Sequence, residues 1–328
     1  MYKVVQIDAD RYQPTVEPGI LAEAGAVLEA IQCHSPEEVI LATREADGVL
    51  VSLTRITRPI IESWKRMKII ARYGVGFDAV DLAAATERGI MVTNVPDFCT
   101  EEVADTTFGL ILALERKLVL MDQLVRQGIF NRMSAQPLHR LRDTTLGIVG
   151  FGRIGKSVAR RAIPFGYRLL ACDPYLDPQA FRHYPVEFVS LETLLQESRV
   201  VSLHVPLTEE TFHFIGEKQV GGMRSEALLI NAARGAIVDQ TALFHALAEG
   251  KIRGAGLDVL EKEPPDPADP LLKLPNLLIT PHYGSYSEEA YQEVRVKAAR
   301  QVAMALQGKI PTYLVNPEVW GHHPHSPF

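Results

Sequence analysis

The sequence lacks the features that direct a chain to a membrane or to nucleic acid. The longest apolar run, FGLILAL, stops at Glu115 and Arg116, well short of a membrane span. The N-terminus reaches acidic residues within ten positions and has no apolar core before a small-residue cleavage site, so we expect no signal peptide. Basic residues number 34 against 40 acidic ones, a net charge of -6, and no long basic run occurs. Nucleic acids and anionic membrane surfaces are therefore disfavoured as partners.

Cysteine is also scarce. Cys33, Cys99 and Cys172 are odd in number and unrelated in spacing, which indicates buried free thiols in a reducing cytoplasm rather than a disulfide framework. The histidine-containing end of the chain, GHHPHSPF, is interpreted as a frayed tail and not as a metal site. We therefore expect a cytoplasmic protein without a bound metal.

The 328 residues, 47% of them apolar and 23% charged, are enough for two domains with their own cores. In the first hundred residues, β-rich runs alternate with helical stretches. Continuous apolar runs separated by helices are typical of parallel strands that are covered on both faces. The expected order is strand KVVQI, helix 18–30, strand GVLVS, helix 57–64, strand MKIIA, helix 79–88 and strand IMVTN.

The rest of the chain repeats this pattern. Residues 101–128 predict one long helix, with acids in its first turn and Gly128 as its stop. A last helix at about 287–307 leads away from the second sheet, and 308–328 reads as a surface segment. Both sheets are therefore predicted to be doubly wound, in an α/β protein. The strands of the second sheet are expected at TLGIV, RLLACD, VEFVS, VVSLHVP, ALLINAA, GAGLDV and NLLITP.

A glycine-rich turn predicts a dinucleotide site. Gly150, Gly152 and Gly155 follow an apolar strand and precede a helix, with Arg153 and Ile154 at the turn into that helix. Such glycines allow a tight turn, close approach of the backbone to a pyrophosphate and close helix packing. Asp173 ends the next strand, 18 residues past Gly155, where a carboxylate binds a ribose diol. No cation for a 2′-phosphate follows it, so the pattern favours NAD over NADP. The alternative is that Asp173 only caps the Asp-Pro-Tyr turn.

Three later strands end in residues suited to catalysis. Arg234 follows LLINAA, Glu263 follows GLDV, and His282 follows LLITP. Ligands in sheets of this kind bind at the carboxyl ends of the strands, so we expect the three side chains to converge beside the nicotinamide. Alone, each side chain has an ordinary structural explanation, as a surface cation, a solvated acid and a histidine at a strand end. Their coincidence in one dinucleotide fold favours a catalytic site.

The blocks GFGRIG, NAARGAIVD, GLDVLEKEPP and TPHYGSYSEE resemble the signatures of the D-isomer-specific 2-hydroxyacid dehydrogenase family over about residues 48–315. IIARYGVGFDAVDL, CDPYL and PHYGSYSEE are most similar to the branch of the C-terminal-binding proteins, NAD-dependent corepressors, and their bacterial relatives. The resemblance implies a Rossmann NAD domain (102–292) inserted into a smaller, flavodoxin-like substrate domain (1–101 and 293–328). It also implies an active site in the cleft and a homodimer built on the NAD domains.

The family's catalytic triad falls on Arg234, Glu263 and His282. Reduction of a 2-oxo acid needs a proton donor for the carbonyl oxygen, and histidine changes charge near neutral pH. A glutamate on the other imidazole nitrogen orients the ring, and an arginine fork binds the substrate's carboxylate and carbonyl. The resemblance also assigns cofactor contacts to Val205, Pro206, Thr211, Ala232, Arg234, Asp258, His282 and Gly284, with Asp258 near the nicotinamide amide.

In the first domain the loop RYGVGFD predicts substrate contacts at Arg72, Val75 and Gly76, because successive exposed N–H groups form a nest for a carboxylate. Arg72 matches an arginine of the corepressor branch that reaches the substrate. Ser285 stands where that branch has a tryptophan, which argues against a bulky substrate and adds Ser285 to the substrate contacts.

We expect an NAD-dependent dehydrogenase that interconverts a small 2-oxo acid, such as glyoxylate or hydroxypyruvate, and its D-2-hydroxy acid. One alternative is D-3-phosphoglycerate dehydrogenase. It is weaker because VSLTRIT offers only Arg55 to a phosphate and because no regulatory domain follows residue 328. A second alternative is an NAD-responsive binding or regulatory protein with weak turnover.

Overall fold

The structure is a computed structural model that describes residues 1–322. Most of the predicted frayed tail, GHHPHSPF, lies outside the described residues. Only the backbone of Gly321 and His322 is described. The chain divides into two compact units, Met1–Phe98 with Ser287–Phe328 (unit 1) and Cys99–Tyr286 (unit 2). The predicted boundary at 292/293 falls inside helix α11 (Glu288–Leu306). Ser287 caps the start of this helix, because its hydroxyl accepts the N–H of Ala290 at 2.9 Å.

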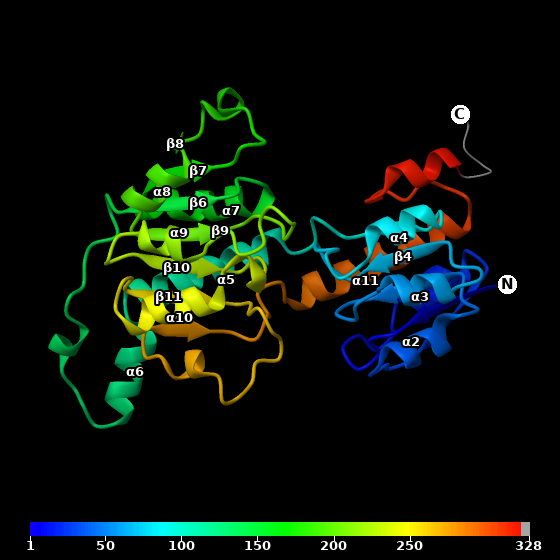
Figure 1. The fold of residues 1–328 in the computed structure, drawn as a ribbon, viewed down its shortest axis with the longest axis horizontal. Helices are drawn as coiled ribbons and strands as arrows, with labels where there is room; N and C mark the ends of the chain where they lie inside the picture. Colours follow the sequence, from blue (N-terminus) through cyan, green and yellow to red (C-terminus); the bar gives the residue numbers. More distant parts are fainter. Residues whose placement is uncertain (323–328) are drawn as a thin grey trace. The chain divides into compact units, whose positions relative to one another are not determined.

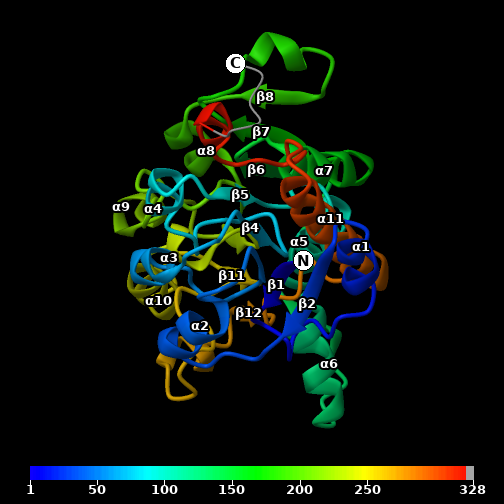
Figure 2. The ribbon, with the colours of Figure 1, turned by 90° about the vertical axis from the view of Figure 1, so that its right-hand side faces the viewer.

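Unit 1 is built on a parallel sheet with the strand order β2-β1-β3-β4-β5, which is the flavodoxin-like order (Figures 1 and 2). Helices α1 and α11 pack together, and α11 covers β3, β4 and β5. Helices α2, α3 and α4 bury their apolar residues on the other face of the sheet. The strands are β1 (Tyr2–Gln6), β2 (Ala26–Ala30), β3 (Gly48–Val51), β4 (Ile69–Arg72) and β5 (Met91–Thr93); the other helices are α1 (Glu17–Ala22), α2 (Pro36–Thr43), α3 (Arg58–Ser63) and α4 (Leu82–Glu87).

One prediction for unit 1 is wrong, and one helix was missed. The stretch 18–30 is not one helix: α1 ends at Ala22, the chain turns at Gly25 (φ 69°), and Ala26–Ala30 forms the edge strand β2. A glycine in the left-handed conformation ends the helix and reverses the chain. Helix α2 was not predicted at all, although Ser35 caps it by accepting the N–H of Glu38.

The segment after α11 is not a simple surface tail. Asn316 is fully buried, accepts the N–H of Val92 at 2.8 Å and donates to the carbonyl of Ile90 at 2.9 Å. Leu314 forms a bridge with Thr93, so this segment covers the edge strand β5. These contacts join positions far apart in the sequence, which is why the local turn pattern did not predict them.

Unit 2 contains the seven predicted strands, in the order β12-β11-β10-β9-β6-β7-β8 and all parallel within the described chain. Reading from β8, this is the Rossmann order 3-2-1-4-5-6 with one further strand. Helices α5 and α7 cover one face, and α8, α9 and α10 cover the other (Figure 1). The strands are β6 (Thr145–Val149), β7 (Arg168–Cys172), β8 (Val186–Phe188), β9 (Val200–Leu203), β10 (Leu228–Asn231), β11 (Gly254–Leu257) and β12 (Leu277–Ile279); the helices are α5 (Thr100–Glu115), α6 (Leu118–Arg126), α7 (Arg153–Ala162), α8 (Leu191–Glu197), α9 (Glu217–Gly221) and α10 (Gln240–Ala248).

The single helix predicted for 101–128 is two helices. Helix α5 ends at Glu115, and Lys117, with φ 54°, redirects the chain into α6. Because a left-handed residue cannot continue a right-handed helix, the break is sharp. No residue of α6 is buried, and no helix among the described residues is long and apolar enough to span a membrane.

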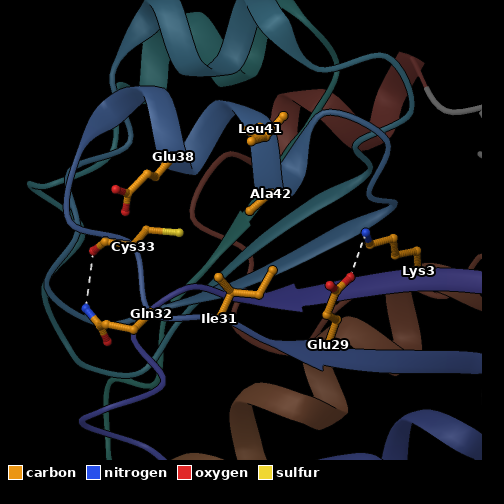
Figure 3. Close-up of a pocket in the computed structure, with 8 residues that line it drawn as sticks. All are labelled: Lys3, Glu29, Ile31, Gln32, Cys33, Glu38, Leu41 and Ala42. Carbon is orange, nitrogen blue, oxygen red and sulfur yellow. Dashed lines mark hydrogen bonds and ion pairs between the residues drawn. The ribbon is translucent and has the colours of Figure 1, made fainter.

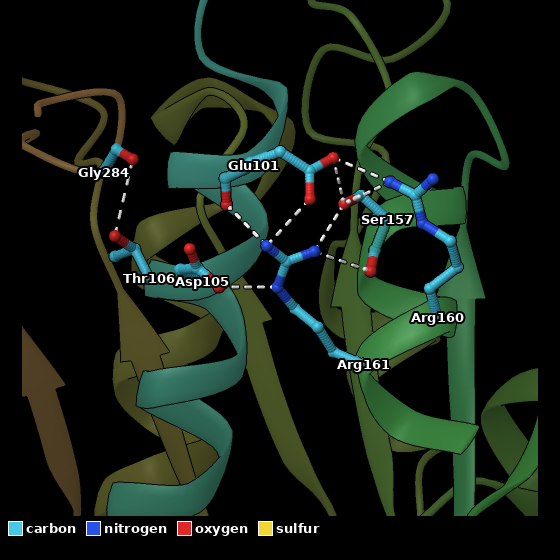
Figure 4. A network of polar contacts seen from close by, with 7 residues as sticks. All are labelled: Glu101, Asp105, Thr106, Ser157, Arg160, Arg161 and Gly284. Carbon is cyan, nitrogen blue, oxygen red and sulfur yellow. Dashed lines mark hydrogen bonds and ion pairs between the residues drawn. The ribbon is translucent and has the colours of Figure 1, made fainter. Parts of the chain in front are cut away.

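The first turn of α5 is fixed to α7 by a network of charged side chains (Figure 4). Glu101 accepts bonds from Ser157 at 3.0 Å and from Arg160 at 2.7 Å, while Arg161 binds Asp105 at 2.6 Å. Helix α5, which follows the junction at 98/99, is therefore held by several contacts to the helix that follows the glycine turn.

Candidate active site

Two glycines of the glycine-rich turn are required by the protein's own packing. Gly150 has φ 87°, and a β-carbon there would lie 2.6 Å from the carbonyl oxygen of His204. A β-carbon on Gly155 would collide with the carbonyl oxygen of Gly150. These glycines allow β6, the turn and α7 to pack closely, as the sequence predicts.

Gly152 is different, because a β-carbon there would have no protein atom within 4 Å among the described residues. It is the N-cap of α7, and no described side chain caps that helix. The N–H groups of the first helical turn, including those of Arg153 and Ile154, have no acceptors within the helix and carry partial positive charge. This open, uncapped helix start fits the pyrophosphate of a dinucleotide.

Asp173 holds the glycine turn in place. Its Oδ2 accepts the N–H of Phe151 at 2.9 Å, and its Oδ1 accepts the N–H of Tyr175 at 3.1 Å. Asp173 therefore does cap the Asp-Pro-Tyr turn, which was the alternative explanation. Each carboxylate oxygen has a second lone pair, so the same group remains able to accept bonds from ribose hydroxyls.

His282 and Glu263 form a hydrogen-bonded pair. The Nδ1 of His282 lies 2.7 Å from Oε2 of Glu263, and Oε1 of Glu263 accepts the N–H of Leu260 at 2.9 Å. Burial raises the pKa of Glu263, but the hydrogen bond and charge of His282, the N–H of Leu260 and the charge of Arg234 outweigh it, so the pKa of this carboxyl lies below its usual value. Glu263 is therefore ionised at neutral pH and leaves Nε2 of His282 for another partner.

Arg234 follows β10 on a turn organised by a buried asparagine. The side chain of Asn231 donates to the carbonyl of Arg234 at 2.9 Å and accepts the N–H of Ala233 at 3.0 Å. The next residue, Gly235, lies against the backbone of Leu260, with no room for a β-carbon. These contacts join the loop of Arg234 to the loop of Glu263. Asn231 and Gly235 were not predicted as site residues, although both lie in the block NAARG.

Asp258 is buried and fixes the segment that carries His282. It accepts bonds from the hydroxyl of Thr280 at 2.6 Å, the N–H of Tyr283 at 3.1 Å and the N–H of Gly284 at 2.9 Å. A β-carbon on Gly284 would lie 2.7 Å from Oδ2 of Asp258. The carboxylate thus positions residues 280–284, and its predicted contact with the nicotinamide amide stays a prediction.

Residues 204–213, after β9, form a loop closed by its own hydrogen bonds. The hydroxyl of Thr211 donates to the carbonyl of Pro206 at 2.6 Å. His213, with φ 50°, binds Glu261 at 2.8 Å and so attaches the loop to the segment that carries Glu263. Burial lowers the pKa of His204 to about 4, so this histidine is neutral. Of the other predicted cofactor contacts, Val205 begins this loop, and Ala232 follows β10 as a partly buried residue.

In unit 1 the loop after β4 has its carbonyl groups bonded and its N–H groups available. The carbonyls of Gly74, Val75 and Gly76 accept bonds from Val95 N at 2.9 Å, Asn94 Nδ2 at 2.7 Å and Arg72 Nε at 3.1 Å. Among the described contacts the N–H groups of these three loop residues donate to no acceptor. This is the arrangement expected of an anion nest. Ser285 belongs to unit 2, where it is partly exposed after Gly284.

A pocket of about 430 Å³ lies elsewhere in unit 1, beside β2 and α2 (Figure 3). It contains none of the predicted site residues, and its charged pair, Lys3 and Glu29, is closed on itself at 2.7 Å. No cluster of metal-binding side chains is found in residues 1–322.

Comparison with known proteins agrees with this geometry. Residues 108–284 match the family described as D-isomer specific 2-hydroxyacid dehydrogenase, NAD binding domain. The chain is 45% identical over 290 residues to a glyoxylate reductase of Korarchaeum cryptofilum, covering 87% of each chain. The chain belongs to the D-isomer specific 2-hydroxyacid dehydrogenase family.

Two further relatives show the breadth of the family. A D-3-phosphoglycerate dehydrogenase of Methanocaldococcus jannaschii is 40% identical over 299 residues, which are 90% of this chain but 56% of that protein. The structure of a D-lactate dehydrogenase from Aquifex aeolicus with NAD and lactic acid has a TM-score of 0.85 and 30% identity, covering 96% of this chain and 99% of that one. The chain is thus an NAD-dependent 2-hydroxyacid dehydrogenase, and its closer likeness to the corepressor branch stays a prediction.

Proposed function

We propose that this dehydrogenase reduces a small 2-oxo acid, glyoxylate or hydroxypyruvate, to the D-2-hydroxy acid, with NADH. The observation that carries the proposal is the 2.7 Å contact between His282 and Glu263, which orients a proton donor at the carboxyl end of the sheet. The glyoxylate reductase at 45% identity supports the choice of a small substrate.

Each residue of the triad has a distinct task in the reaction. His282 donates a proton from Nε2 to the carbonyl oxygen and, in the reverse direction, removes it from the hydroxyl. Glu263 holds the ring through Nδ1 and so fixes its orientation. The guanidinium of Arg234 binds the substrate's carboxylate and carbonyl oxygens as a fork. NADH, held by the glycine turn and Asp173, would supply the hydride.

Unit 1 contributes to substrate binding through the loop after β4. Its three available N–H groups suit a carboxylate, and the side chain of Arg72 is fixed by its bond to Gly76. Ser285 offers a small polar side chain, which favours an acid without a bulky apolar tail. The predicted contacts at Val75 and Gly76 are therefore main-chain contacts.

A screen of NADH oxidation against about twenty 2-oxo acids, including 3-phosphohydroxypyruvate, tests the proposal. Glyoxylate or hydroxypyruvate should give the highest kcat/KM. A preference for the phosphorylated acid would instead identify the chain as a phosphoglycerate dehydrogenase. Tight NADH binding without turnover on any acid would favour the NAD-responsive regulatory protein.

We also propose that the chain is a cytoplasmic homodimer that associates through unit 2. None of the residues of α6 is buried although the helix is largely apolar, and Ile129 and Phe130 beyond it are exposed, Phe130 to 93%. Exposed apolar surface of this extent marks an interface. The three cysteines are free, as expected of a reducing compartment.

A further inference from the structure

Unit 1 contains a buried ion pair that takes no part in the proposed chemistry. The guanidinium of Arg295, on α11, binds Glu17, on α1, through Nε and Nη2, both at 2.8 Å. Both side chains are almost completely buried. A buried ion pair gives little net stability, because removing two charges from water costs about as much as their attraction returns. A positional task therefore explains the pair better than a contribution to stability.

The pair is connected to the substrate loop through Tyr73. This tyrosine lies between Arg72 and Gly74, and its Oη is 3.0 Å from Oε1 of Glu17 and 3.1 Å from Oε1 of Gln6. Both neighbours accept, so the single phenol proton is donated to one of them at a time. Burial and the charge of Glu17 hold the pKa of Tyr73 well above its usual value, which keeps the phenol a donor.

A stack of aromatic rings holds the same residue from the side. The ring of Tyr12 lies between those of Tyr73, at 4.6 Å, and Tyr291, at 4.9 Å, and both pairs are nearly parallel. The guanidinium of Arg295 lies 5.3 Å from the centre of the Tyr291 ring and donates to the carbonyl of Gln13 at 2.6 Å. Rings held on both sides by packing lose their freedom to change rotamer.

We infer that Tyr73, fixed by the Glu17–Arg295 pair, is a positioning residue that sets the loop 72–76 for binding the substrate's carboxylate. The inference rests on the proposed function, because it assumes that this loop binds a 2-oxo acid. Tyr73 does not touch the substrate itself. It fixes the backbone between Arg72 and the available N–H groups of the nest, and a nest binds an anion only when those groups converge.

The test compares Tyr73→Phe with Tyr167→Phe. Each variant removes one buried phenol oxygen close to a buried carboxylate. Tyr167, however, belongs to unit 2, where it directly precedes β7 and lies near Glu115. For Tyr73→Phe we expect the KM for the 2-oxo acid to rise about tenfold, equivalent to about 1.4 kcal/mol, with kcat and the KM for NADH nearly unchanged. Tyr167→Phe should leave all three parameters at their wild-type values.

Hydrogen exchange gives a readout that does not depend on turnover. The amides of Tyr73 and Val95 donate to Val51 and Gly74, so both should be protected in the wild type. Tyr73→Phe should speed the exchange of both amides without changing the melting temperature by more than a few degrees. Glu17→Gln should also speed the exchange of both amides, but it leaves the buried charge of Arg295 without its partner, so its melting temperature should fall as well.

The outcomes separate the two ideas. If the wild type reduces no 2-oxo acid, the proposed function fails before any variant is compared. If the wild type turns over but Tyr73→Phe keeps the wild-type KM and exchange, only the positioning role is overturned. The positioning role would also be overturned if Tyr167→Phe raised the KM for the 2-oxo acid as much as Tyr73→Phe does. An equal rise in the KM for NADH in Tyr73→Phe would have the same meaning.

Discussion

Gly235 lies against the backbone of Leu260 so closely that a β-carbon at residue 235 would overlap the carbonyl group of Leu260. Gly235 follows Arg234 directly, and the N–H of Leu260 donates to Glu263. The contact thus sets the distance between the loops that carry the arginine and the glutamate of the proposed triad. A methyl group at this position must move one loop away from the other.

Gly235→Ala should therefore lower kcat/KM for the 2-oxo acid by about two powers of ten, since a displacement of about 1 Å at an active site has that effect. Binding of NADH, measured by fluorescence titration, should change much less. Gly221→Ala, also in unit 2, is the control, because a β-carbon there meets no atom within 4 Å. Equal activity of the two variants would show that the contact at Leu260 does not set the active-site geometry.

His282→Ala and Arg234→Ala should each reduce turnover by about two to four powers of ten, the usual effect of losing a proton donor or a charge clamp. Both variants should still bind NADH, because the glycine turn and Asp173 are untouched. If both variants kept near wild-type activity on every accepted acid, the assignment of the catalytic triad would be wrong.

Glu263→Gln should remove a pH dependence on the acid side of the reduction. The pKa of Glu263 lies below its usual value partly because of its bond to His282, so the wild type should lose this carboxylate only at a pH below the usual range of a glutamate. The amide of the variant is neutral at every pH, so kcat/KM should already be about two powers of ten lower at neutral pH and should show no further fall in that acid range. A variant with the wild-type kcat/KM at neutral pH would show that the ionised carboxylate is not needed.

Local sequence patterns predicted those parts of the fold that depend on neighbouring residues alone. Continuous apolar runs located the seven strands of unit 2, and the spacing of Gly150, Gly152 and Gly155 located the tight turn between β6 and α7. The break at Lys117 was missed because no glycine or proline marks it. Strand β2 was missed because the alanine-rich stretch around Gly25 also has good helix propensity.

Parts of the site that depend on contacts between distant loops could not be predicted. The positions of Arg234, Glu263 and His282 at strand ends follow from the sequence, because each comes directly after an apolar run or shortly beyond it. The bonds of Asp258 to Thr280 and Gly284, and the fit of Gly235 against Leu260, join separate loops. No local pattern contains that information. Likewise, Asp173 was predicted as a ribose ligand, but its bond to Phe151 is visible only in the fold.

Replacing Phe130 and Ile129 by aspartate should dissociate the proposed homodimer. Both side chains are exposed beyond α6, where charges would lose solvation on association. Sedimentation equilibrium should show a monomer for this double variant and a dimer for the wild type. Leu41→Asp is the control, because Leu41 is an apolar residue of unit 1 that is 83% exposed. A wild type that is already monomeric, or a double variant that stays dimeric, would exclude this interface.

The choice between NAD and NADP should depend on Asp173. Its carboxylate should accept bonds from the adenine ribose and repel a 2′-phosphate. Replacing Asp173 by serine and Pro174 by arginine removes the repulsion and adds a phosphate partner, so kcat/KM should fall for NADH and rise for NADPH. The ratio should move by at least an order of magnitude, about 1.4 kcal/mol.

The structure shows why this variant needs a control. Asp173 also accepts the N–H groups of Phe151 and Tyr175, so its loss loosens the glycine turn whatever the cofactor. Asp173→Asn removes the charge but keeps one acceptor oxygen, so it loses only one of the two bonds to Phe151 and Tyr175. If the charge decides the choice, Asp173→Asn should already move the NADPH-to-NADH ratio upward, and the double variant should move it further. If Asp173 only holds the turn, both variants should lose activity with both cofactors in proportion and melt at lower temperature. Kinetics with each cofactor and a melting curve for each protein distinguish these results, because a constant ratio rules out the ribose contact.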